Sequence, residues 1–151
     1  MSEESLRRVW PALLVALVSV IAGGLLSAVT AHAATRSASW AAAYLVLVGG
    51  VATGGLAAGR ALLSSPFPRP ARLWVEFALW FAGNAFVLVG TLLSPRWLVE
   101  VGSGLLVASL ASLVAGVRGG TGPVVARRLF LALVTVLLVS IPVGVFLSHL
   151  R

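Results

Sequence analysis

Residues 9–33 read VWPALLVALVSVIAGGLLSAVTAHA and carry no charged side chain. An α-helix rises about 1.5 Å per residue, so roughly 20 apolar residues cross a hydrocarbon core of about 30 Å. The run is long enough for that, and Pro11 lies in its first turn, where a missing N–H breaks no hydrogen bond. This stretch therefore predicts a transmembrane helix from about Val9 to Ala33.

Four further apolar runs of similar length follow, over residues 38–63, 72–93, 97–117 and 124–149. The connections between them are short and leave no room for a soluble domain. Within a bilayer a helix satisfies its own backbone hydrogen bonds, which makes it the expected spanning element. We therefore predict an all-α integral membrane protein, a five-transmembrane-helix bundle that forms a single transmembrane domain over residues 1–151.

The composition indicates a membrane location. Hydrophobic residues make up 60% of the 151 residues and charged residues 10%, whereas soluble domains are about 45–50% apolar and about 25% charged. The formal charge of +7 does not indicate nucleic-acid binding, because the basic residues are scattered between apolar runs. There is no cysteine, which excludes thiolate metal sites. All basic residues are Arg, and Ala, Val, Leu and Gly dominate, which favours a GC-rich genome and a prokaryotic plasma membrane.

The arginines predict the orientation of the chain. An Arg–Trp pair such as Arg72–Trp74 marks the start of four of the five runs, and both residue types favour the membrane–water boundary. Cytoplasmic loops retain positive charge. With a cytoplasmic N-terminus, eight arginines lie inside (Arg7, Arg8, Arg60, Arg69, Arg72, Arg118, Arg127, Arg128) and three lie outside (Arg36, Arg96, Arg151). We therefore predict a cytoplasmic N-terminus and an extracytoplasmic C-terminus.

The N-terminus also permits a second interpretation. Arg7-Arg8, an apolar stretch and Ala31-His32-Ala33 imitate the three regions of a cleaved signal peptide. The uncharged run is longer than the usual apolar region of about 7–15 residues, which favours an uncleaved first helix. Cleavage would leave four spans and place the mature N-terminus outside.

Small residues four apart mark the faces where membrane helices approach closely. One such stripe is predicted in the fourth run and another in the second. The two stripes are Gly104, Ala108, Ser112 and Gly116, and Gly50, Gly54 and Ala58. They are interpreted first as seams inside the bundle, and alternatively as a contact with another subunit.

Polar side chains at membrane depth are few, and such groups are the first candidates for function. Glu76, Trp80 and Asn84 share one face of the third run. Glu76 lies near the start of its helix and four residues after Arg72, so we expect it to stay charged at the inner boundary. Asn84 lies near the midplane, where a structural hydrogen bond is the simpler interpretation and a polar cavity for a solute the alternative.

Two histidines, His32 and His149, end the first and fifth runs at the predicted outer face. A pair of imidazoles can ligate haem or copper. No further ligand cluster accompanies them, so no cofactor is predicted and the metal hypothesis ranks last.

The sequence thus predicts a small membrane protein with no catalytic site of its own. We expect an accessory or structural subunit, or a bundle that associates with itself or with other membrane subunits in the lipid bilayer. A small transporter or channel using Glu76 and Asn84 is the first alternative. A haem- or metal-binding redox subunit using His32 and His149 is the second.

Overall fold

The computed structural model describes residues 3–33, 35–64, 68–93, 95–118, 120 and 122–149, with side chains as far as Phe146. Within that part of the chain every regular element is a helix, and five spans are long and apolar enough to cross a membrane. The predicted all-helical class and the five long apolar helices are therefore confirmed. Contacts between Cα atoms divide the chain into two compact units, Met1–Ala58 and Gly59–Arg151.

The first helix, α1, covers Glu3–Val29 and is followed by a short 3-10 turn, η1, over Ala31–Ala33. It begins well before the predicted start at Val9. Two acidic residues, Glu3 and Glu4, occupy its first turn, where they suit the positive end of the helix dipole. Glu4 also pairs with Arg8 one turn later. Charge rather than apolar character stabilises this turn, so the apolar run alone does not predict it.

The second span is a continuous helix of three segments: α2 (Arg36–Tyr44), η2 (Leu45–Ala52) and α3 (Thr53–Leu63). Thr35 caps its start, because the Thr35 hydroxyl accepts a hydrogen bond from the Ala38 N–H at 3.2 Å. The middle segment, η2, is π-helical, with hydrogen bonds from residue i+5 back to residue i. Both the N–H and the hydroxyl of Thr53 donate to the Val48 carbonyl oxygen. The second span is therefore wider in its middle than an α-helix.

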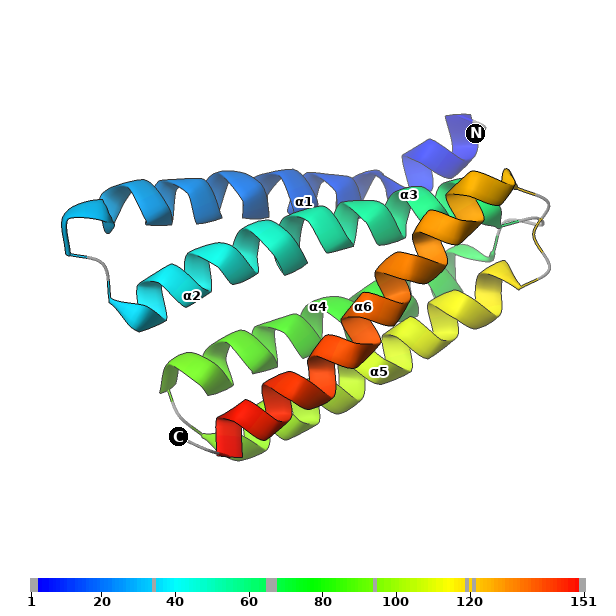
Figure 1. Cartoon of the computed structure of the whole chain (residues 1–151). Coiled ribbons are helices and arrows are strands. Elements are labelled where there is room, and N and C mark those ends of the chain that lie inside the picture. The colour runs from blue at the N-terminus through cyan, green and yellow to red at the C-terminus, as the bar shows by residue number, and fades with distance from the viewer. Residues whose placement is uncertain are drawn as a thin grey trace. The chain divides into compact units, whose positions relative to one another are not determined.

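In the first unit, α1 runs beside α2 and η2 (Figure 1). Glycines allow this approach. A Cβ on Gly23 would lie 2.8 Å from the Ala42 carbonyl oxygen, and one on Gly50 would lie 2.3 Å from the Val20 side chain. Neither position has room for a larger residue, so the two helices meet through small side chains.

In the second unit, α4 (Pro70–Leu93) packs along α5 (Arg96–Val117), and α5 also contacts α6 (Val124–His149). The α4 and α5 backbones meet at two facing glycines. A Cβ on Gly83 would lie 2.9 Å from the Gly102 carbonyl oxygen, and a Cβ on Gly102 would lie 2.8 Å from that of Gly83. This close crossing aligns the start of α4 with the end of α5.

Gly120 and Gly122, between α5 and α6, lie against the end of α3. A Cβ on Gly120 would lie 1.6 Å from the Leu63 carbonyl oxygen, and one on Gly122 would lie 2.8 Å from that of Leu62. Residues with side chains do not fit at these two positions, so glycine allows this close approach to α3.

Candidate functional site

A buried carboxylate lies in the second unit, near the end of α3 and the start of α4. The Glu76 side chain, in the second turn of α4, is 1% exposed. Its Oε1 atom accepts three hydrogen bonds, from Arg60 Nη2 at 3.0 Å, Arg72 Nε at 3.0 Å and Ser112 Oγ at 3.1 Å. Side chains from three helices thus meet on one oxygen atom.

The Arg60 side chain, in the last turn of α3, is also 1% exposed. Its Nη1 atom donates to the Ser64 hydroxyl at 3.0 Å. The guanidinium lies directly against α5, since a Cβ on Gly116 would be 1.9 Å from Nη1 and 2.3 Å from Cζ. Gly116 thereby supplies the space that admits Arg60 into the unit.

The α5 helix adds two hydroxyl groups to the cluster. Ser112 binds the Glu76 carboxylate, and Ser109 Oγ donates to the Glu76 backbone oxygen at 2.9 Å. These serines are three residues apart and Gly116 follows four residues later, so all three lie on one helical face. That face of α5 contacts Glu76 of α4 through the two serines and contacts the Arg60 guanidinium at Gly116.

The charged residues of the cluster differ in exposure, and two of their buried atoms lack a hydrogen-bond partner among the described residues. The Arg72 side chain is 51% exposed, whereas those of Arg60 and Glu76 are each 1% exposed. In the described part of the protein, Glu76 Oε2 and Arg60 Nε have no hydrogen-bond partner although both atoms are buried. The cluster holds a buried ion pair with one further acceptor and one further donor at its centre.

The other predicted polar residues lie further along α4. Trp80 is buried, and Asn84 is half-buried and donates from Nδ2 to the Trp80 carbonyl oxygen at 2.7 Å. This bond runs back one turn within the same helix. The structure therefore joins Glu76 to Arg60 and Ser112, and joins Asn84 to its own helix.

The predicted small-residue stripes are placed as follows. Gly50 is buried against α1, Ala58 is half-buried, and a Cβ on Gly54 would lie 3.7 Å from the Ala16 side chain. On α5, Ser112 and Gly116 contact the charge cluster. Gly104 and Ala108 are exposed, and a Cβ on Gly104 would meet nothing within 4 Å.

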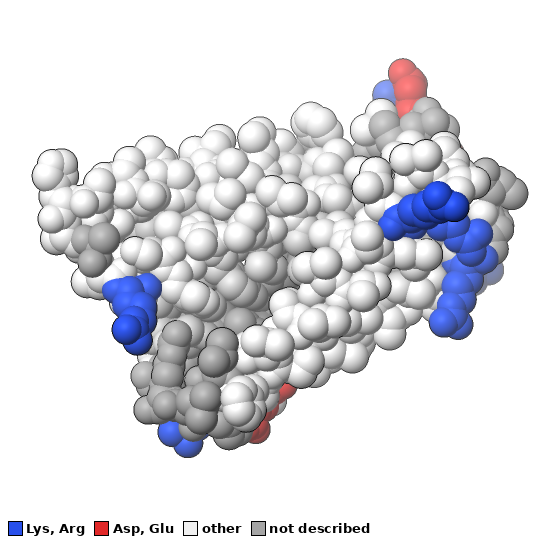
Figure 2. Space-filling model, in the orientation of Figure 1, with Lys and Arg blue, Asp and Glu red and all other residues white. Residues whose placement is uncertain are grey.

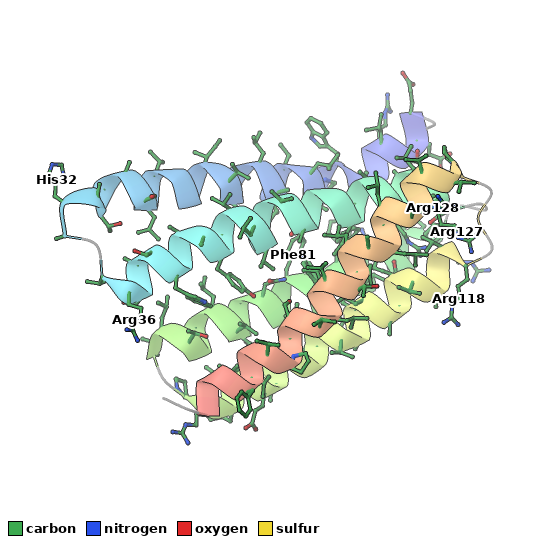
Figure 3. The ribbon with its side chains drawn as sticks, viewed as in Figure 1. His32, Arg36, Phe81, Arg118, Arg127 and Arg128 are labelled. Carbon is green, nitrogen blue, oxygen red and sulfur yellow. The ribbon has the colours of Figure 1, made fainter. Side chains whose placement is uncertain are left out.

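The two histidines belong to different units. His32 is exposed in η1, and His149 belongs to α6 but its side chain lies outside the described residues (Figure 3). Among the residues that are described, no group of three metal-ligating side chains occurs. The haem or copper hypothesis stays a prediction.

Sequence reasoning misses Arg60, Ser109 and the role of Gly116. The sequence places Arg60 among the cytoplasmic charges because it lies close to the predicted end of its run. One signal points the other way, since a charged residue between Gly59 and Ala61 lies inside the apolar run rather than after it. Its partner, 16 residues away, is a tertiary contact that no local pattern specifies.

Comparison of the chain with protein-family models, with curated proteins and with solved structures gives no match.

Proposed function

We propose that this chain is a multi-pass protein of a prokaryotic plasma membrane, with a cytoplasmic N-terminus and an extracytoplasmic C-terminus. Five long apolar helices support this placement. In the second unit, the six arginines of the cytoplasmic side under this topology all lie near the end of α3, the start of α4 or the junction of α5 and α6. Reporter fusions at each connection test the orientation, and an extracytoplasmic signal from the α5–α6 connection would reverse it.

Within that membrane, we propose an accessory or structural role without chemistry of its own. The observation that carries the proposal is that the charged groups at membrane depth bind one another. Arg60 and Glu76 are buried against each other, and α5 donates two hydrogen bonds to Glu76. The charged groups of the cluster thus bind one another, which supports a role in holding the helices of this chain together.

A contact with another subunit is proposed on α5. Gly104 and Ala108 are exposed there, and small residues allow close approach of a second helix. Native mass spectrometry of the full chain from mild detergent measures the assembly. An Ala108→Leu variant should lose the associated copy or subunit, whereas Ala85→Leu, at an exposed alanine of α4, should keep it. A wild-type chain that is monomeric and without a stoichiometric companion in its native membrane would overturn the proposal.

Transport is the second candidate, and one observation favours it. Glu76 Oε2 is a buried carboxylate oxygen without a donor among the described residues, and buried carboxylates in membrane proteins mark proton and ion pathways. Proton flux into liposomes containing the purified chain tests it. Flux should be lost in Glu76→Gln while circular dichroism shows that its helices are retained, and it should be kept in Glu100→Gln, whose parent residue is exposed. No proton flux above empty liposomes would eliminate proton transport and favour the accessory role.

A further inference from the structure

Three arginines gather where α5 ends and α6 begins. Arg118 follows the last residue of α5, and Arg127 and Arg128 lie in the first turns of α6. Arg127 Nη2 reaches the Arg118 carbonyl oxygen at 3.5 Å. All three are exposed and are labelled in Figure 3. Figure 2 shows blue side chains on the surface where α6 begins. The contact holds the Arg127 guanidinium against the Arg118 backbone, so the two arginines lie together at one edge of the unit.

No described carboxylate of this unit compensates them. Its two acidic residues are Glu76 and Glu100. Glu76 is buried with Arg60 and Arg72, so its charge is already engaged. Glu100 precedes Arg118 by 18 positions along α5, which is about 27 Å of helix. The three guanidinium groups therefore form an anion-attracting surface whose own repulsion an anionic ligand would relieve.

The neighbouring surface is apolar. Val124, Val125 and Leu129 are exposed beside the arginines on α6. A free anion or a nucleic acid would leave these side chains in water. A lipid satisfies both features, because its phosphate meets guanidinium groups while its acyl chains cover aliphatic side chains.

Two glycines between the arginines pack against α3. Gly120 and Gly122 approach the Leu63 and Leu62 carbonyl oxygens so closely that a Cβ does not fit at either position. Arg118 and Arg127 flank these two glycines along the chain. Two donors carried on packed helices lose less backbone freedom on binding than a flexible basic tail.

From these observations we infer a specific site for an anionic phospholipid, with Arg118 and Arg127 binding the headgroup phosphate and Arg128 adding to the attraction. Arg suits this task because its planar guanidinium offers two parallel donors to a phosphate. The inference rests on the membrane placement proposed above. It assigns an anionic phospholipid to the end of the second unit where α5 ends and α6 begins.

The test compares lipids of opposite headgroup character, one anionic and one without net charge. The full chain, in nanodiscs or micelles, is titrated with phosphatidylglycerol and with phosphatidylcholine of the same acyl chains, and retained lipid is counted by native mass spectrometry. The wild type should retain phosphatidylglycerol preferentially. Attraction of about 1 kcal/mol per basic residue corresponds to about fivefold in affinity, so Arg118→Gln/Arg127→Gln should weaken retention roughly 25-fold.

Controls separate the possible outcomes. Arg36→Gln/Arg96→Gln removes the same charge elsewhere and should keep the preference, and Arg127→Lys should weaken it because the paired donors are lost. An unchanged preference in Arg118→Gln/Arg127→Gln would overturn the site. Displacement of the lipid by millimolar inorganic phosphate would instead identify a free-phosphate site and also overturn the lipid assignment. Membrane fractionation of the same variants tests the placement independently, because a chain lacking only the lipid site still sediments with membranes.

Discussion

The buried ion pair allows a quantitative prediction, because Glu76 has two cationic partners at the same distance. Arg60 Nη2 and Arg72 Nε both lie 3.0 Å from Oε1. The partners differ in exposure, at 1% for Arg60 and 51% for Arg72. Distance alone predicts equal contributions to stability, whereas burial predicts very different ones.

Burial changes the energy through the surrounding dielectric. Unit charges about 4 Å apart attract by about 4 kcal/mol at an effective dielectric constant of 20, and by about 1 kcal/mol in water. Removing one member of a buried pair leaves the other charge uncompensated, at about 3–5 kcal/mol, while an exposed pair contributes about 0–1 kcal/mol. We expect Glu76→Gln to lower the free energy of unfolding by about 3–5 kcal/mol and Arg72→Met by less than about 1 kcal/mol.

The double variant Arg60→Met/Glu76→Leu completes the comparison. It removes both buried charges, and such replacements are often neutral or stabilising by about 1–4 kcal/mol. It should therefore unfold no more easily than the wild type. Equilibrium unfolding in mixed micelles, followed by circular dichroism, gives the four free energies. A loss in Arg72→Met equal to that in Glu76→Gln, or a double variant as unstable as Glu76→Gln, would refute the argument from burial.

Four further changes probe the packing of α5, one of them a control at an open position. Gly116→Ala should lower the free energy of unfolding by about 1–3 kcal/mol, because the new Cβ would overlap the Arg60 guanidinium. Gly102→Ala should lower it comparably by forcing α4 away from α5, whereas Gly104→Ala, at an open position, should leave it equal or raise it by up to about 1 kcal/mol. Ser109→Ala should lower it by about 0.6–1.7 kcal/mol through the lost bond to the Glu76 carbonyl. Thermal melts in detergent measure all of them, and equal melting temperatures for Gly102→Ala and Gly104→Ala would contradict the packing described.

The positions of the helices are largely predictable because length and polarity decide them. Predicted ends at Leu63, Leu93 and Val117 coincide with the observed ends of α3, α4 and α5. The early start of α1 does not follow from apolar residues, since its first turn is stabilised by charge. The π-helical segment is not predicted either, because the apolar pattern of a wider turn does not differ from that of an α-helical one.

The charge cluster is predictable only in part. The sequence identifies Glu76 as a candidate but predicts only Arg72 as its partner, because residues four apart on one helix are recognisable as a pair. Arg60 and Ser112 come from other helices, and their contacts depend on how α3 and α5 pack against α4. The stripe through Gly116 predicts a helix contact, whereas the structure places a guanidinium there.

The position of Arg60 and Glu76 on consecutive helices bears on how the chain enters a bilayer. Each charge alone disfavours insertion of its helix, by up to about 2.5–3.5 kcal/mol near the centre of a span. The two helices follow one another along the chain, so the ion pair can form in a hairpin before α5 is synthesised. We therefore expect the second span and α4 to insert together, with the Arg60 charge balanced by Glu76. Glycosylation mapping of chains truncated after Leu93 should show lower insertion of α4 in Arg60→Leu than in the wild type.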